Sequence, residues 1–537
     1  MKTLVKRTEG SRKRQGKRTQ VMQRQVPPRT GIDRFLWVHS GRIVALLCVY
    51  AGLRILIFAA AFPIFNITDE QFHLLSIRMY ARGEWPGNDL PKVDEESAKL
   101  FAMYGTLEYV GAKETMKHAP PIYQLSNQEL FIHRFAPKYV FWMNDRNFEG
   151  QSAPFYYLLG AGWYRLGEAL GMQSWGLAYW VRFLNPAAYV VLVWVSYRLV
   201  RKVYPDRVFL WLGVPALLAV FPQDVYFGIN REVLSAPMTA VALLLMVKTV
   251  DEEESKGWLL LFASVLVGLT FLVDVSNWVL YGAFALTLWF WARQSTAKPI
   301  SKAGVVCGAG FASMLLPSAW MLRNYLVMGD LTGSRAKIEF LSWTMKPRGE
   351  LFNHPLFTLN GASYFLGNLV RTFWRGEYLW DGKPMSWPPA DWLYLLSSVA
   401  MVAAFTVQLF RGWKNKTLMQ RLTESQSLLL FLTSVLFMAA ISLLFDFHKC
   451  VNPSREHPFF VSGRIISGAL LPFVLMYVAG MEFLLRPIRK WRPAALALAC
   501  LLVFITIAEF QVRRVAFSSP YNFFALRAWP GKPLLGF

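Results

Sequence analysis

The sequence predicts an all-α polytopic membrane protein. Of its 537 residues, 54% are hydrophobic and 15% aromatic, while only 17% are charged, which is too few for a soluble multidomain protein of this length. Apolar stretches of about 20 residues, long enough to cross roughly 30 Å of hydrocarbon as a helix, recur between residues 43 and 511. The four cysteines show neither a disulfide framework nor zinc spacing.

Residues 1–41 form a basic segment ahead of the first apolar run. The formal net charge is +23, and 12 of the 57 lysines and arginines lie within residues 1–42. Lys and Arg gather on the cytoplasmic side of membrane proteins and near anionic lipid, so we expect a cytoplasmic tail that contacts membrane lipids and no nucleic acid. No small-residue cleavage site follows the run, which predicts an uncleaved anchor.

About eleven transmembrane helices account for the apolar stretches and for the basic clusters between them. After the first apolar run, which begins at residue 43, spans are expected at residues 178–199, 208–226, 232–249, 258–275, 277–292, 303–321, 392–411, 427–445, 465–485 and 493–511. With the N-terminus inside, this arrangement leaves the basic clusters at 198–207, 292–302, 411–421 and 486–492 in the cytoplasm.

One further apolar stretch, residues 153–171, would reverse this topology if it crossed the membrane. We interpret it as a juxtamembrane or re-entrant helix, because it is short and contains Arg165 and Glu168. The first external loop then covers residues 63–177, and the second external region covers residues 322–391. A smaller external segment follows at 446–464, and residues 486–537 hold the last transmembrane helix and an external C-terminal tail.

The sequence TDEQFH, residues 68–73, begins the first external loop. Asp69 and Glu70 form a carboxylate pair at the membrane boundary, which suits proton removal from a hydroxyl group or binding of a cation. The same residues also fit a helix N-terminus, with Thr68 or Asp69 as the N-cap. His73 lies on the same helical face; we favour a hydrogen-bonded neighbour over a metal ligand, because no second Glu-x-x-His is present.

Cations at the expected external boundary are candidates for binding an anionic phosphate. Arg323 begins the second external region, Arg464 begins a span, and Arg371 and Arg375 lie in the aromatic-rich RTFWRGEYLW. The alternative for each is an interfacial side chain within an aromatic belt.

A denser basic and aromatic group is formed by Lys449, Arg455 and His457. Its alternative is a loop held in shape by prolines. Arg54 lies in the middle of the first span, where a charged side chain must face protein or water, and we expect it to have a structural partner.

Six segments resemble, in order, the GT-C type glycosyltransferases, which are polytopic enzymes that use polyprenyl-phosphate sugars. They are the D-E-x-x-H-like start of the first loop, QSAPFYYLLGAGWYRLG (151–167), VRFLNPAAYVVLVWVSYRLVRKVYPD (181–206), NREVLSAPMTAVALLLM (230–246), WMLRNYLVMGDLTG (320–333) and SGRIISGALLPFVLM (462–476). The chain departs from the superfamily pattern at Ser152 and Ala153, at Glu232 in place of Asp, and at Asp274 in place of a basic residue. It is similar to the protein mannosyltransferase and aminoarabinose transferase-like group, and most to its bacterial members.

The resemblance implies a GT-C fold, with a membrane catalytic domain over residues 42–485. It implies an inverting glycosyltransferase that moves a sugar from a polyprenyl-phosphate donor to a glycan, lipid or protein acceptor, on the outer face of a bacterial inner membrane. Asp69 would deprotonate the acceptor hydroxyl, Glu70 would orient Asp69 or the acceptor, and Glu232 would be a second carboxylate. Arginine would hold the leaving phosphate, and the residues expected to bind substrate or donor phosphate are Arg323, Arg375, Arg464, Glu232, His73, Lys449 and Arg455. No metal and no other cofactor is expected.

Two other functions remain open. One is a transporter or flippase for a lipid-linked substrate, which would be expected to carry broken or charged helices near the membrane midplane and an inverted repeat. The other is a non-enzymatic assembly protein for envelope polysaccharide.

Overall fold

Helices dominate the computed structural model of this chain, which describes residues 31–66, 69–105, 120–251, 257–448, 453–489 and 492–535. In that part of the chain, 8 helical segments are long and apolar enough to cross a membrane. They are Arg34–Ala61, Trp175–Val203, Arg231–Thr249, Pro299–Met328, Pro388–Arg411, Leu418–Leu444, Gly463–Arg486 and Arg492–Ala528. The predicted class, an all-α membrane protein, is confirmed.

A helix occupies every range in which a span was expected. These helices are α2 (Ile32–Ala61), α9 (Leu184–Val203), α10 (Val208–Val220), α11 (Ser235–Thr249), α12 (Gly257–Phe271), α13 (Leu280–Gln294), α14 (Pro299–Met328), α17 (Pro388–Arg411), α18 (Leu418–Leu444), α19 (Leu470–Arg489) and α20 (Arg492–Arg513). Four of them, α10, α11, α12 and α13, have 13, 15, 15 and 15 residues, fewer than the roughly 20 that a helix needs to cross a bilayer alone. A preceding 3-10 turn extends the segment of α11 to the 19 residues Arg231–Thr249.

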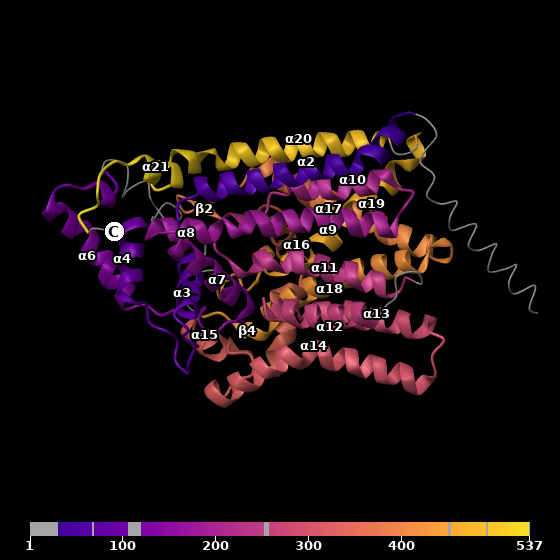
Figure 1. Ribbon diagram of the computed structural model, residues 1–537, viewed down its shortest axis with the longest axis horizontal. Helices are drawn as coiled ribbons and strands as arrows, with labels where there is room; N and C mark the ends of the chain where they lie inside the picture. The colour runs from indigo at the N-terminus through magenta and orange to yellow at the C-terminus, as the bar shows by residue number, and fades with distance from the viewer. Residues whose placement is uncertain are drawn as a thin grey trace, which may run out of the picture.

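Shorter helices connect these and gather largely at one end of the long axis (Figure 1). The α-helices among them are α3 (Glu70–Ala81), α4 (Glu95–Tyr104), α6 (Gln128–Met143), α7 (Phe155–Ala169), α8 (Trp175–Arg182), α15 (Arg335–Phe340), α16 (Leu359–Arg375) and α21 (Phe523–Ala528). The 3-10 turns used below are η3 (Asp224–Phe227), η4 (Arg231–Leu234), η5 (Val275–Val279), η6 (Arg348–Asn353), η7 (Pro355–Phe357) and η9 (Gly463–Ala469). The stretch at 153–171 forms α7, a separate helix.

Sheet is minimal among the described residues. Strand β1 (Thr344–Met345) pairs antiparallel with β4 (Phe445–Asp446), and β2 (Leu379–Trp380) pairs antiparallel with β3 (Lys383–Pro384).

Local sequence explains where several helices begin and end. Helix α14 begins with Pro299, whose missing N–H costs nothing in the first turn, and ends at Gly329, which adopts a left-handed φ of 67°. Helix α18 begins with a capping box, in which Thr417 and Gln420 each bond the backbone N–H of the other.

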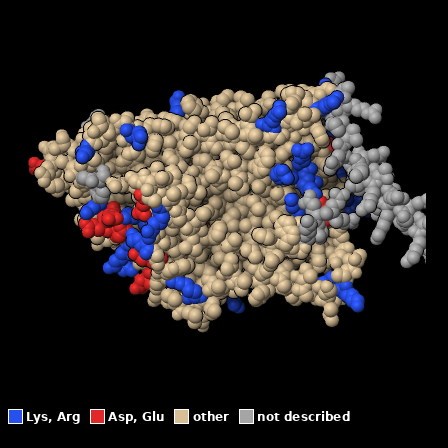
Figure 2. All heavy atoms as spheres, in the orientation of Figure 1, with Lys and Arg blue, Asp and Glu red and all other residues tan. Residues whose placement is uncertain are grey.

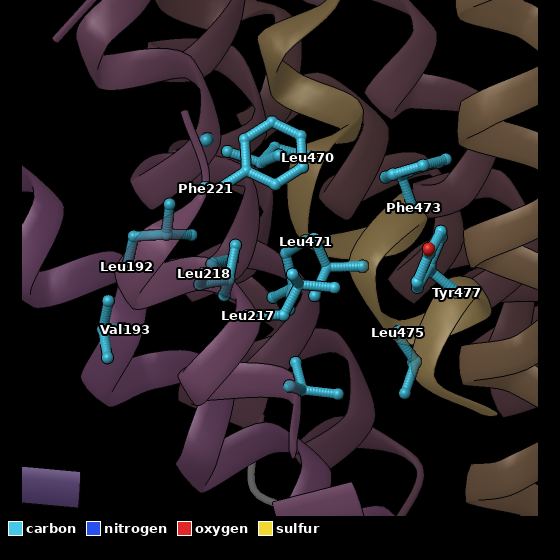
Figure 3. Close-up of a cluster of buried hydrophobic side chains, with 14 of the residues drawn as sticks. Leu192, Val193, Leu217, Leu218, Phe221, Leu470, Leu471, Phe473, Leu475 and Tyr477 are labelled. Carbon is cyan, nitrogen blue, oxygen red and sulfur yellow. The ribbon is translucent and has the colours of Figure 1, made fainter. Parts of the chain in front are cut away.

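The interior of the bundle is apolar. Figure 3 shows Leu192 and Val193 of α9, Leu217 and Leu218 of α10, and Leu471 of α19 among the buried side chains of one cluster. On the outside, Figure 2 shows a broad surface almost without charge, with Lys and Arg at both of its ends and most of the visible Asp and Glu near one end. An uncharged belt between two charged ends is the surface expected of a protein embedded in a bilayer.

Arg54 has the structural partner that its position in the first span requires. Its Nε donates to Glu509 Oε2 at 2.6 Å, and its Nη2 donates to the carbonyl of Phe221 at 2.9 Å. Arg513 bonds the same carboxylate, so two arginines share Glu509 inside the bundle. This network joins α2 to α20.

Candidate functional site

The site is built around an ion pair between Asp69 and Arg464. Arg464 Nη2 donates to Asp69 Oδ2 at 2.7 Å, and the two side chains are 21% and 16% exposed. Asp69 precedes α3, while Arg464 lies in η9 at the start of α19. Both groups therefore remain partly open to a ligand, which a purely structural buried pair would not be.

The backbone of Asp69 is strained. Its φ is 68° and its ψ is 3°, the left-handed conformation, which costs a residue with a side chain roughly 1–3 kcal/mol and persists only where the surroundings enforce it. Asp69 does occupy the N-cap position of α3, but its side chain makes no capping hydrogen bond. Its carboxylate bonds Arg464 instead, so the N-cap prediction holds for the position and not for the side chain.

Glu70 and Arg182 fix the chain on either side of Asp69. Both are fully buried, and Arg182 donates to both carboxylate oxygens of Glu70 at 2.6 Å. The remaining guanidinium N–H groups donate to the carbonyls of Ala59, Phe62 and Pro63, at the end of α2. All five N–H donors of Arg182 thus have acceptors.

The carboxylate oxygens of Glu70 also have several hydrogen-bond donors. Besides Arg182, it accepts from the backbone N–H of Phe65 at 2.8 Å and of Ile229 at 2.9 Å. A carboxylate so enclosed cannot reach a substrate. Of the two roles predicted for Glu70, orienting Asp69 therefore fits this geometry, and direct contact with an acceptor does not.

Two glycines, Gly463 and Gly376, allow close backbone packing around Arg464. The backbone of Gly463 lies against α16, where an added Cβ would come within 2.1 Å of the backbone nitrogen of Phe373. Gly376, with a φ of 89°, lies so close to Asp224 that no Cβ fits. These contacts place Arg464 and Glu377, the residues that follow the two glycines, next to each other.

Glu377 is a second carboxylate beside Arg464. Its Oε2 lies 3.7 Å from Arg464 Nε, and its side chain is 21% exposed. Its Oε1 has no hydrogen-bond partner among the described residues. Burial raises the pKa of Glu377, and the nearby charge of Asp69 adds to this, while Arg464 acts against it.

A second cluster is centred on Arg231, in η4. Arg231 bonds both Asp274 and Glu149, and Lys337 of α15 also bonds Glu149. Burial alone would raise the pKa of Glu149, but the charges of Arg231 and Lys337 outweigh it and hold that pKa well below its ordinary value. The cluster ties η4 to α15, to the segment before α7 and to the start of η5, where Asp274 is the N-cap residue.

Glu232 lies between the two clusters. Its Oε1 is 3.9 Å from Arg231 Nε, a loose contact, and its Oε2 has no hydrogen-bond partner among the described residues. Ser467 in η9 donates to its backbone carbonyl at 3.1 Å. The side chain is only 4% exposed, so Glu232 is a buried carboxylate beside the site.

His73 is a buried neighbour of the site. Its Nδ1 lies 2.9 Å from the hydroxyl of Tyr157, and the residue is 2% exposed. Burial lowers the pKa of His73 to about 3; the charges of Arg231 and Arg464 act in the same direction, and those of Glu149 and Asp69 act against it. His73 is therefore neutral at physiological pH and adds no positive charge to the site.

We expect His73 to make stability fall in mild acid. Because the pKa is lower in the folded state, the unfolded chain binds the proton first, so this contribution is complete above the ordinary value of 6.5 and is lost as pH falls towards about 3. Between pH 7.5 and 5 the loss amounts to about 2 kcal/mol. In His73→Gln, thermal unfolding should shift less between these two pH values than in the wild type; an equal shift in both proteins would contradict the assignment.

Two other predicted arginines have protein partners. Arg323 donates to the carbonyl of Pro86 and lies over the ring of Trp85. Arg375 Nε bonds Asp391 Oδ1 at 3.0 Å. Their partners lie elsewhere than Asp69, which is the partner of Arg464.

The predicted basic group consists of Lys449, Arg455 and His457. Lys449 lies outside the described residues, which end at 448 and resume at 453. Arg455 is exposed and bonds Asp446 and His448 at 3.1 and 2.6 Å. These contacts agree with the alternative of a structured loop.

Three residues of the site were not singled out from the sequence: Arg182, Glu377 and Glu149. A signal existed for Arg182 and Glu377. Arg182 follows a strongly apolar stretch, and a charge there needs a buried partner. Glu377 directly follows RTFWRG, where only the basic residues were considered.

The arrangement offers a partly exposed carboxylate and a cation in contact, with a second partly exposed carboxylate, Glu377, and a buried one, Glu232, beside them. Such a set can accept a proton from a hydroxyl group, bind sugar hydroxyls and stabilise a developing negative charge. No family model matches the chain, and no curated protein matches it significantly.

Proposed function

We propose that this protein is an inverting glycosyltransferase of the GT-C type, which moves a sugar from a polyprenyl-phosphate donor to an acceptor at the outer face of the membrane. The observation that carries the proposal is the Asp69–Arg464 pair. It places a base and a cation together, partly open, at the end of the bundle where α3 lies.

In the proposed reaction, Asp69 accepts the proton of the acceptor hydroxyl. The acceptor oxygen then forms a bond to the anomeric carbon, and the bond from that carbon to the phosphate oxygen breaks, with inversion. The leaving group is polyprenyl phosphate, which keeps the electron pair of the broken bond. The products are the glycosylated acceptor, polyprenyl phosphate and protonated Asp69, which returns its proton to solvent.

Arg464 serves both ends of this step. A guanidinium presents its donors in several directions, so one arginine can hold the base with one nitrogen and approach the leaving phosphate with another. Glu377, whose side chain is 21% exposed, is an acceptor suited to a sugar hydroxyl, and Glu232 is a buried second carboxylate beside it. Glu70 and Arg182 hold Asp69 in place, and no other cofactor is proposed.

The proposal includes about eleven spans with the N-terminus inside. Its support is that α2 begins at the end of the bundle opposite to α21, as an odd number of crossings requires (Figure 1). Helices α10, α12 and α13 are short, and we propose that they cross the membrane where neighbouring helices surround them.

Topology is tested with a reporter fused after Phe537. We expect it to report the external side in a bacterial host, because an odd number of spans separates the two termini. A cytoplasmic signal from this fusion, together with a cytoplasmic signal from an N-terminal fusion, would exclude the eleven-span arrangement.

Activity is tested with the purified full-length protein in liposomes that contain lipid extract from the host envelope. The expected result is release of free polyprenyl phosphate, detected by mass spectrometry, only when an acceptor fraction is present. Movement of intact sugar-linked lipid between leaflets without release would favour the flippase. Neither release nor movement, with an envelope defect when the gene is deleted, would favour the assembly protein.

A further inference from the structure

Helix α16 has one apolar face on the bundle and exposes two further large apolar side chains. Phe365, Leu369 and Phe373, four residues apart, form a buried stripe against the bundle. On the other side, Tyr364 is 46% and Leu366 48% exposed. A short helix with one apolar face on protein and apolar side chains also facing outward fits a position beside lipid.

Arg371 on this helix has no anionic partner among the residues that the structure describes. Its guanidinium makes no ion pair and no hydrogen bond with the residues that the structure describes, and its Nε is buried without an acceptor. By contrast Arg375, one turn further along, is paired with Asp391. The one marked contact of Arg371 is with Trp392, whose ring centroid lies 5.2 Å from its Cζ.

Trp392 sets the position of this contact in the membrane. It lies near the start of α17, a helix long and apolar enough to cross a bilayer, and it is 54% exposed. Leu393 and Leu396 beside it are also exposed. An exposed Trp at the end of a span marks the boundary between hydrocarbon and headgroups, where lipid phosphates lie.

We propose that Arg371 and Trp392 bind the phosphate of a membrane lipid at this boundary. A snorkelling arginine keeps its whole guanidinium in water, whereas the Nε of Arg371 is enclosed and has no acceptor. Phosphate oxygens supply acceptors for several N–H groups at once, and the lipid chains then lie on Leu366, Leu393 and Leu396.

The site is next to Arg464 through α16. Thr372, which follows Arg371, donates to the carbonyl of Val461 at 2.5 Å and accepts from Gly463 N at 3.1 Å. The phosphate belongs either to a bulk phospholipid or to a polyprenyl phosphate. The site is independent of the proposed reaction, because a phospholipid fills it equally well in a transporter.

Native mass spectrometry of the full-length protein in detergent tests the site. The probes are phosphatidylglycerol, polyprenyl phosphate, diacylglycerol and inorganic phosphate. The variants are Arg371→Gln, Arg371→Lys and Trp392→Leu. The matched control is Arg335→Gln, at an arginine that is 69% exposed in its side chain and paired with Glu339.

Arg371→Gln should weaken binding of the phosphate lipids about tenfold, and Arg371→Lys less, while the control binds as the wild type does. Trp392→Leu should also weaken binding, and it keeps the test valid if Arg371→Gln fails to fold. Weaker binding of phosphatidylglycerol, of polyprenyl phosphate or of both by the variants supports the site, and the lipid that is affected identifies its occupant. Wild-type binding of both lipids in Arg371→Gln and Trp392→Leu overturns it, as does an equal loss of diacylglycerol. If inorganic phosphate at millimolar concentration displaces the lipids, the site binds free phosphate, and the proposal of a lipid site is overturned.

Discussion

Exchange of Arg182 for Gln is expected to lower the free energy of unfolding by about 3–5 kcal/mol, because it leaves the charge of Glu70 buried without its partner. Glu70→Gln should destabilise the protein comparably by leaving Arg182 uncompensated. Both side chains are fully buried, and together they hold the end of α2 against the start of α3. Thermal unfolding in detergent, followed by tryptophan fluorescence, measures the effect.

Two controls separate this ion pair from a general loss of packing. The double variant Arg182→Met with Glu70→Leu removes both charges and should be less destabilised than either single variant. Arg335→Gln breaks an exposed pair and should change stability by no more than about 1 kcal/mol. If the single variants and the double variant all unfold at the same temperature as the wild type, the ion pair does not hold Asp69 in place.

Asp69→Asn is expected to lower sugar transfer about 10²- to 10⁴-fold, because an amide cannot accept the proton of the acceptor hydroxyl. Folding should be retained, since Asp69 is partly exposed and Asn tolerates its left-handed backbone. Release of polyprenyl phosphate by the purified variant measures the loss.

The matched control for that exchange is Asp89→Asn, at an exposed position of the same loop. It should transfer sugar at the wild-type rate. Unchanged transfer in Asp69→Asn would remove Asp69 as the base, and a loss that is equal in both variants would point to a general effect of the loop.

The helices could be predicted from the sequence because their signal is local. Apolar length alone located every long helix, and the charges between them indicated that 153–171 is a separate element. The need of Arg54 for a partner was predictable from the cost of burying a charge, but Glu509 was not, since nothing in the sequence pairs residues so far apart.

Part of the candidate site could also be predicted from the sequence. Expected topology assigned Asp69 and Arg464 to one face of the membrane, and the structure pairs them. The enclosure of Glu70 by Arg182 and the closeness of Glu377 to Arg464 arise from tertiary packing. Glu377 and Arg464 come close because Gly376 and Gly463, which precede them, have no room for a side chain. The sequence alone does not show which residues pack against a glycine.

The most direct test of the proposed function is a density map of the Asp69→Asn protein with a bound polyprenyl-phosphate sugar, since this variant should bind the donor without turning it over. We expect the anomeric carbon near residue 69 and the phosphate in contact with Arg464. A donor bound with its sugar on the opposite end of the bundle, or with its phosphate away from Arg464, would contradict the account.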